Sequence, residues 1–141
     1  MDKLTPERRS ANMSRIRSRH TSPEMIVRRL VHGMGYRYRL HVASLPGKPD
    51  IVLPRLKKII EVRGCFWHQH PGCTDSHIPK SRIQYWEPKL ARNQRRDEDN
   101  GRKLRKLGWK VCLVWECETK VTRKLLRRLH RFLGTRPAIC G

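Results

Sequence analysis

The chain has 141 residues, with 33 Lys or Arg against 12 Asp or Glu, so its formal net charge is +21. A chain of this length can build one core, and its charge predicts a polyanionic partner, most often nucleic acid. A ribosomal-type basic protein would share this composition. We expect no membrane partner and a cytoplasmic location, because no stretch approaches roughly 20 apolar residues and the first residues lack a signal peptide's apolar run.

The chain divides into a basic N-terminal arm at 1–20, a single domain at 21–134 and a short tail at 135–141. Within the domain, the periodicity of apolar residues predicts a helix, three strands, a helix, a strand and a helix. The last strand is the most apolar, and we expect it at the centre of the sheet. Helices are expected at 21–35, about 88–107 and 120–133, and strands at 36–40, 50–53, 57–63 and 109–115.

Two local patterns make this prediction specific. Thr21 is expected to cap the first helix of the domain, with Glu24 three residues later as in a capping box. In the strand at 57–63, alternation places Ile59, Glu61 and Arg63 on one face of the sheet.

Two cysteines and two histidines lie within the nine residues from Cys65 to Cys73. A set of three thiols and one imidazole is typical of structural zinc sites, and here it would consist of Cys65, Cys73, Cys117 and His70. Such an ion would hold a long loop of low apolar content against the end of the sheet. The alternative is a group of ordinary thiols and loop histidines. His68 is two residues from His70, so it can point away from the ion.

Acidic residues precede this loop at strand positions. Asp50 begins one predicted strand, and Glu61 and Arg63 share a face of the next. Nucleases hold Mg²⁺ through carboxylates, and a nearby cation stabilises charge on phosphoryl oxygens. Charged residues on a solvated strand face would give the same pattern, but the adjoining cysteine cluster and the high positive charge favour a nuclease. Glu24 is a helix cap in one interpretation and a further metal-site carboxylate in another.

These motifs together resemble the very short patch repair (Vsr) endonucleases, a branch of the PD-(D/E)xK nucleases. The resemblance covers about residues 5–133. It rests on Asn12-Met13, Glu24, the segment Ser-Leu-Pro-Gly-Lys-Pro-Asp at 44–50, the segment Gly-Cys-Phe-Trp-His-Gln-His at 64–70, Tyr85-Trp86, Lys89, Asn93, and the segments 107–111 and 115–117. It implies an α/β restriction-endonuclease-like three-layer fold, with a central mixed sheet flanked by helices and a zinc-pinned loop.

The resemblance also implies a function. The family nicks one strand of double-stranded DNA at T·G mismatches, which arise when 5-methylcytosine deaminates, by Mg²⁺-dependent phosphodiester hydrolysis. We expect a monomer associated with the cytoplasmic nucleoid. There are two alternatives: a zinc-stabilised nucleic-acid-binding module without catalysis, or a related nuclease that acts on other DNA structures.

Individual roles follow from the resemblance by position. Asp50 and the backbone carbonyl of Val62 would bind Mg²⁺, and His68 would act in proton transfer with support from Glu24. Structural Zn²⁺ would be bound by Cys65, His70, Cys73 and Cys117. The DNA contacts would be Phe66, Trp67 and Trp86 as wedges in the base stack, Met13 from the minor groove, and Lys89 and Asn93 near the mismatch. An ordinary core position is the alternative for each ring.

This chain departs from the family pattern at two catalytic candidates. A characterised relative has an aromatic residue at the position of Glu61 and a histidine at the position of Arg63. Arg63 cannot act as a base near neutral pH, so any role of its position in activating water would pass to His68 or to the metal. Glu61 is a candidate for a second metal contact.

Overall fold

A computed structural model describes residues 21–134, so the predicted arm with Met13 and the predicted tail lie outside the described residues. The described part contains one four-stranded sheet in the order β1-β2-β3-β4. The strands are Arg39–Leu40 (β1), Ile51–Leu53 (β2), Lys58–Arg63 (β3) and Lys110–Trp115 (β4). The first three pair antiparallel and β3 pairs with β4 in parallel, which confirms the mixed sheet.

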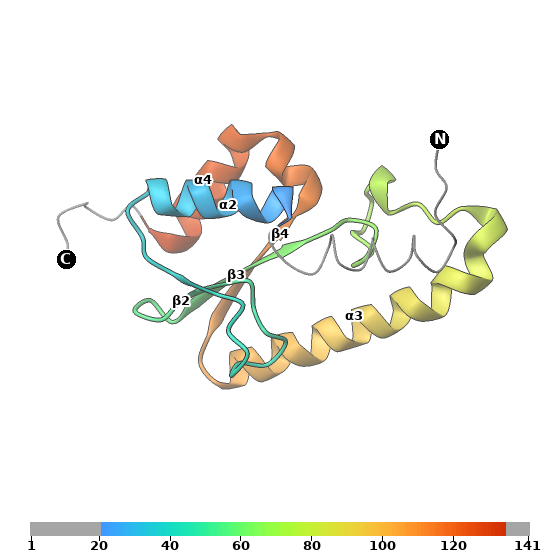
Figure 1. The fold of residues 1–141 in the computed structure, drawn as a ribbon, viewed down its shortest axis with the longest axis horizontal. Helices are drawn as coiled ribbons and strands as arrows, with labels where there is room; N and C mark the ends of the chain where they lie inside the picture. The colour runs from blue at the N-terminus through green and yellow to red at the C-terminus, as the bar shows by residue number, and fades with distance from the viewer. Residues whose placement is uncertain (1–20, 135–141) are drawn as a thin grey trace.

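Helices cover both faces of this sheet (Figure 1). Helices α2 (Ser22–Gly33) and α4 (Thr122–Leu133) lie on one face, and α3 (Ile83–Lys106) runs along the other. Short 3-10 turns connect them at Thr74–Ser76 (η1), Lys80–Arg82 (η2) and Glu116–Lys120 (η3). The described residues therefore form three layers. None of the described helices combines the length and apolar content required to cross a bilayer.

The alternation of side chains along the strands supplies both layer interfaces. On β3, Ile60 packs into the cluster that contains Val31 of α2 and Leu129 of α4, whereas Ile59 packs against Leu104 of α3. All five of these side chains are fully buried. Full burial of each aliphatic chain contributes about 1.5–3 kcal/mol. The predicted division of the β3 side chains between two faces is confirmed.

Three elements differ from the prediction, in each case because of tertiary contacts. Strand β4 is an edge strand among the described residues, and its apolar character comes from helices on both of its faces. Strand β1 has two residues, because Tyr36 enters the core and donates hydrogen bonds to the carbonyl oxygens of Leu133 and Gly134, at 3.0 and 2.8 Å. Helix α3 begins at Ile83, five residues before the predicted start at Pro88.

The additional turn of α3 places aromatic residues beyond the sheet. With 24 residues the helix is about 36 Å long. Its N-terminal half extends past the edge of the sheet, and its C-terminal half packs beneath β4 (Figure 1). Trp86 lies in the extended half, where it contacts the rings of the cysteine loop. These contacts stabilise the first turn although Pro88 is inside the helix.

Candidate active site and metal centre

The cysteine loop folds so that four ligand side chains converge. The Sγ atoms of Cys65, Cys73 and Cys117 and a ring nitrogen of His70 all lie within 4.8 Å of one another. His70 Nδ1 is 3.7 Å from Cys65 Sγ and 3.5 Å from Cys117 Sγ. Ligand bonds of about 2.3 and 2.05 Å at a tetrahedral zinc would separate sulfur and nitrogen by about 3.6 Å. The four side chains fit a tetrahedral zinc ion.

The strand arrangement explains why distant cysteines meet. Cys65 directly follows β3 and Cys117 follows β4, and parallel strands end at the same edge of the sheet. The His70 ring stacks on Trp115 with centroids 4.2 Å apart, which fixes its orientation. Burial, together with the two neighbouring thiols, raises the pKa of the Cys65 thiol to about 12. A thiol this hard to ionise in the metal-free protein becomes a thiolate when a cation binds.

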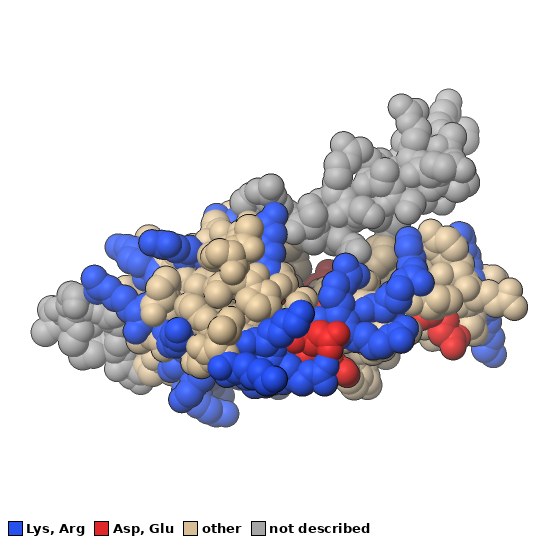
Figure 2. All heavy atoms as spheres, turned by 90° about the horizontal axis from the view of Figure 1, so that it is seen from below, with Lys and Arg blue, Asp and Glu red and all other residues tan. Residues whose placement is uncertain are grey.

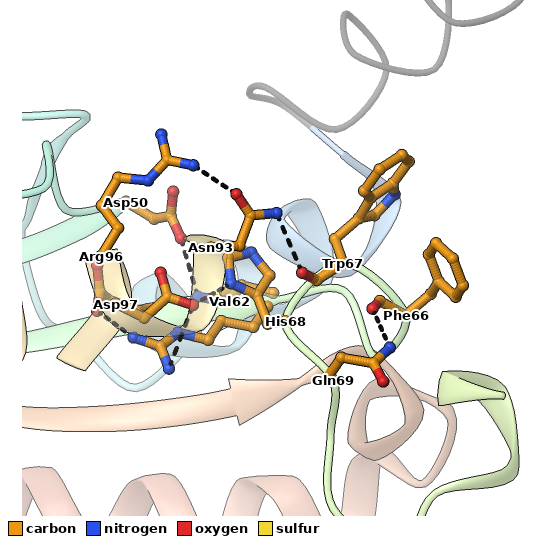
Figure 3. A network of polar contacts seen from close by, with 11 residues as sticks. Asp50, Val62, Phe66, Trp67, His68, Gln69, Asn93, Arg96 and Asp97 are labelled. Atoms are coloured by element: carbon orange, nitrogen blue, oxygen red, sulfur yellow. Dashed lines mark hydrogen bonds and ion pairs between the residues drawn. The ribbon is translucent and has the colours of Figure 1, made fainter. Parts of the chain in front are cut away.

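Asp50 belongs to a second cluster. One ligand atom from each of Glu24, His41 and Asp50 lies within 4.8 Å of the others. Glu24 is in the first turn of α2, His41 follows β1 and Asp50 precedes β2, so three separate elements supply the cluster. The Val62 backbone N–H donates a hydrogen bond to Asp50 Oδ2 at 2.9 Å (Figure 3). This group can hold a cation through two carboxylates and an imidazole.

The charge balance of this cluster favours a bound cation. Burial, with a smaller contribution from the neighbouring acids Glu24 and Glu61, raises the pKa of Asp50 to about 6, although the Val62 hydrogen bond and His41 act to lower it. The Glu24 carboxylate is 3% exposed and lies 3.0 Å from His41 Nε2 and 3.4 Å from Arg28. The Glu24 backbone N–H donates to Thr21 Oγ1, which confirms the predicted cap, while its carboxylate is directed into the cluster.

Glu61, Arg63 and His68 line a cleft between the sheet and α3. Arg63 forms an ion pair with Glu61 at 3.3 Å, and burial raises the pKa of Glu61 despite this partner. His68 Nδ1 lies 2.6 Å from Asp97 Oδ2 (Figure 3). Arg63 approaches the same oxygen at 4.0 Å. The group around Asp50 thus draws its carboxylates from Asp50 and Glu24, with Glu61 paired to Arg63.

Val62 connects the two groups. Its N–H donates a hydrogen bond to Asp50, and Val62 also lines a second hollow together with His68 and Trp67. The two groups also interact electrostatically through Glu61. His68 lowers the pKa of Glu61, and Glu61 raises the pKa of Asp50. Val62 therefore contacts Asp50 through its N–H and shares a hollow with His68.

An aromatic cluster adjoins His68 on the same loop. The rings of Phe66, Trp67 and Trp86 meet edge to face, with centroids 5.1 to 5.4 Å apart. Tyr85, which is 46% exposed, extends the cluster at 4.9 Å from Trp86. In Figure 3 the Phe66 and Trp67 rings project away from Asp50 and Asp97. The rings are half-buried against one another rather than inserted into either core cluster.

Polar residues of α3 surround this cluster. Lys89 Nζ lies over the Tyr85 and Trp86 rings at 5.2 and 5.7 Å. Asn93 is buried, and its side-chain amide donates to the Trp67 carbonyl at 3.3 Å (Figure 3). Asn93 therefore holds the loop that carries the rings, whereas Lys89 reaches its open side.

Two residues of these groups were not identified from the sequence. Asp97 lies four residues after Asn93 on α3, so helical spacing could have pointed to it. His41 lies in a loop with no motif around it, and only the fold brings it to Asp50.

A positively charged surface lies on α3. Figure 2 shows the face seen from below, where Lys and Arg side chains far outnumber acidic ones. A shallow hollow there is lined by Arg92, Arg95, Arg96, Asp99, Asn100 and Lys103. This surface is suited to the phosphate backbone of a nucleic acid.

Known proteins resemble the chain over most of its length. The family described as DNA mismatch endonuclease Vsr matches residues 1–74. The chain is 47% identical over 132 residues to the type II nicking enzyme V.XorIIP of Xanthomonas oryzae pv. oryzae, spanning 94% of this chain and 96% of that one. It is 43% identical over 133 residues to the type II nicking enzyme V.NmeAIP of Neisseria meningitidis serogroup A, spanning 92% and 94%. It is 40% identical over 124 residues to the DNA mismatch endonuclease Vsr of Escherichia coli, spanning 88% and 77%. The chain belongs to the Vsr family of DNA mismatch endonucleases.

Proposed function

We propose that this protein nicks one strand of double-stranded DNA at T·G mismatches by Mg²⁺-dependent hydrolysis of a phosphodiester bond. The observation that carries the proposal is that Asp50 and His68 both border Val62, directly beside the cluster of Phe66 and Trp67. Mismatch nicking requires three kinds of group: carboxylates that bind a metal, a histidine held in place by a carboxylate, and aromatic rings on an exposed loop. We also propose that the fold is that of the PD-(D/E)xK nucleases.

Asp50 and the backbone carbonyl of Val62 are the proposed Mg²⁺ ligands. In an antiparallel ladder, the N–H and C=O of one residue point toward the same neighbouring strand. The Val62 N–H donates to Asp50, so its carbonyl faces the same side. Mg²⁺ is commonly bound through one or two carboxylates with several waters retained. When bound, it would polarise the phosphate and lower the pKa of a nearby water.

His68 is the proposed proton-transfer group. Its Nδ1 has a carboxylate partner in Asp97 at 2.6 Å, so Nδ1 carries the proton and Nε2 is the basic atom. This arrangement lets Nε2 accept a proton from the attacking water. Glu24 would support this site through the Asp50 cluster. Arg63, held by Glu61, would stabilise negative charge on the phosphoryl oxygens.

The ring cluster would open the mismatched step. Unstacking a base step costs a few kcal/mol, and the cost is lowest at a mismatch. Phe66, Trp67 and His68 all lie between Cys65 and His70, so zinc at the cysteine cluster would hold wedge and proton acceptor in one orientation. Trp86 completes the wedge, and Met13 of the arm would press from the minor groove.

Recognition of the surrounding DNA would come from α3. Lys89, above the rings, would contact the mismatch neighbourhood directly, and Asn93 would contribute to recognition by holding the loop that carries Trp67. The positively charged α3 surface would supply salt-dependent affinity for phosphates. We propose that the protein acts as a monomer on the cytoplasmic nucleoid, with 21–134 as its nuclease domain, 1–20 as a DNA-binding arm and 135–141 as a tail.

The decisive experiment compares T·G, fully matched and four-way DNA substrates with and without Mg²⁺. We expect nicking of one strand of the T·G duplex only when Mg²⁺ is present, and loss of nicking with retained binding in Asp50→Asn. Binding without cleavage on any substrate would favour the zinc-stabilised binding module. Faster cleavage of the matched or four-way DNA would favour a different nuclease specificity.

A further inference from the structure

His41 is placed to contact a cation at the Asp50 cluster. Its Nε2 lies 3.0 Å from Glu24 Oε1, and its side chain is 9% exposed. Its ring offers a nitrogen within 4.8 Å of the ligand oxygens of both Glu24 and Asp50. Its backbone N–H donates to the Asp50 carbonyl oxygen at 3.0 Å, which ties the histidine to the residue that the proposed mechanism places on the metal.

The separation of His41 and Glu24 matches that of neighbouring ligands on a metal ion. Neighbouring ligands at about 2.1 Å from an octahedral ion are about 3.0 Å apart, which is the separation of His41 Nε2 and Glu24 Oε1. Without a cation, the same two atoms are joined by a hydrogen bond. On metal binding its proton would leave Nε2 for Nδ1 or solvent, which frees the Nε2 lone pair for the cation at the same separation from Glu24.

An imidazole changes which cation such a site prefers. Mg²⁺ selects oxygen ligands and retains its waters, whereas nitrogen ligands favour first-row transition ions. Two carboxylates and one imidazole therefore hold a transition ion more tightly than two carboxylates do.

We propose that His41 is a direct ligand of the catalytic cation, so that this site binds Mn²⁺ more tightly than Mg²⁺. The inference rests on the proposed function, since it concerns the same metal site. It assigns to His41 a coordination role beyond holding Glu24 in place.

The test uses the zinc-loaded full chain without DNA, with Mn²⁺ as the probe. Electron paramagnetic resonance counts the bound Mn²⁺, and the ¹⁴N modulation of the electron spin echo reports directly coordinated nitrogen. We expect ¹⁴N modulation in the wild type, and Mn²⁺ affinity above Mg²⁺ affinity by about tenfold or more. A wild-type spectrum without nitrogen modulation overturns the proposal, and this measurement depends on no variant.

His41→Gln identifies the nitrogen. Glutamine keeps a hydrogen-bonding group for Glu24 and offers an oxygen that Mg²⁺ accepts. We expect loss of the ¹⁴N modulation and about tenfold weaker Mn²⁺ binding, with Mg²⁺ binding changed much less. The matched control is His32→Gln, at an exposed histidine of α2, which should leave the spectrum unchanged. Nitrogen modulation that persists in His41→Gln would overturn the assignment.

Failure of this inference can be separated from failure of the proposed function. Mg²⁺-dependent nicking of T·G DNA tests the function, and the spin-echo measurement tests the ligand in the absence of DNA. Nicking without nitrogen coordination would overturn the role of His41 alone. Nicking retained by Asp50→Asn would overturn the proposed mechanism whatever the spectrum shows.

Discussion

Removing the charge of Asp50 should stabilise the protein in the absence of Mg²⁺ while abolishing its activity. Burial raises the pKa of this carboxyl from 3.8 to about 6. Each tenfold change in proton affinity is worth 1.36 kcal/mol, so ionised Asp50 costs the folded state about 3 kcal/mol. Asp50→Asn removes this cost and keeps an oxygen that can accept the Val62 hydrogen bond.

The sign of the pH dependence follows from the raised pKa. The folded protein holds the Asp50 proton more tightly than the unfolded chain does, so the cost is absent below about pH 4. It grows as the pH rises toward 6 and is complete above the folded-state pKa. We therefore expect Asp50→Asn to match the wild type near pH 4 and to exceed it by about 1–3 kcal/mol at pH 8. Partial hydration of the site accounts for the lower end of this range.

The assay is denaturant unfolding of zinc-loaded wild type and variant between pH 4 and 8, without added Mg²⁺. Taking the difference between the two proteins cancels the titration of groups that do not interact with Asp50. The control is Asp99→Asn, because Asp99 is 56% exposed and its ion pair with Arg102 on the helix surface should contribute within about 0.5 kcal/mol. Added Mg²⁺ should stabilise the wild type and not Asp50→Asn. A difference that stays constant from pH 4 to 8, or a less stable Asp50→Asn at pH 8, would refute the argument that Asp50 is a desolvated carboxylate.

Three further predictions concern the other parts of the site. Cys65→Ser should lose zinc, measured by metal analysis, and unfold, because four ligands close the tetrahedral site; a stable metal-free variant would count against the zinc assignment. Trp67→Ala should reduce the preference for T·G over matched duplex in binding assays more than it reduces overall affinity, whereas equal losses on both duplexes would contradict a wedge. Asp97→Asn should slow single-turnover nicking by about 10²–10⁴-fold with mismatch binding retained, since it removes the carboxylate that holds His68 Nδ1; an unchanged rate would remove His68 and Asp97 from proton transfer.

Local patterns could be predicted from the sequence because they depend on residues close together in the chain. The cap at Thr21 requires only the next turn of helix, and its hydrogen bond to the Glu24 N–H is present. The alternation of Ile59 and Ile60 follows from strand geometry alone, and each packs against a different layer. The dense spacing of Cys65, His70 and Cys73 likewise indicated a metal-binding set, and all three converge.

Other features could not be read from local patterns. The start of α3 depends on Trp86 meeting the rings of a loop some twenty residues earlier. The edge position of β4 could not be predicted from its composition, because an edge strand covered by helices on both faces is as apolar as a central strand. Asp97 could be assigned to the site only from its contact with His68 across the cleft, which appears in the folded structure.

The layer pattern, the cysteine–histidine ligand set and the family follow from the amino-acid sequence, because they depend on periodicity, residue type and motif spacing. The charged groups that share a site could be identified only in the folded protein, where Glu61 pairs with Arg63, His68 pairs with Asp97, and His41 lies beside Glu24 and Asp50. Electrostatic and coordination partners must lie within a few ångströms of one another in space. Strand pairing and helix packing bring such partners together across tens of residues of chain.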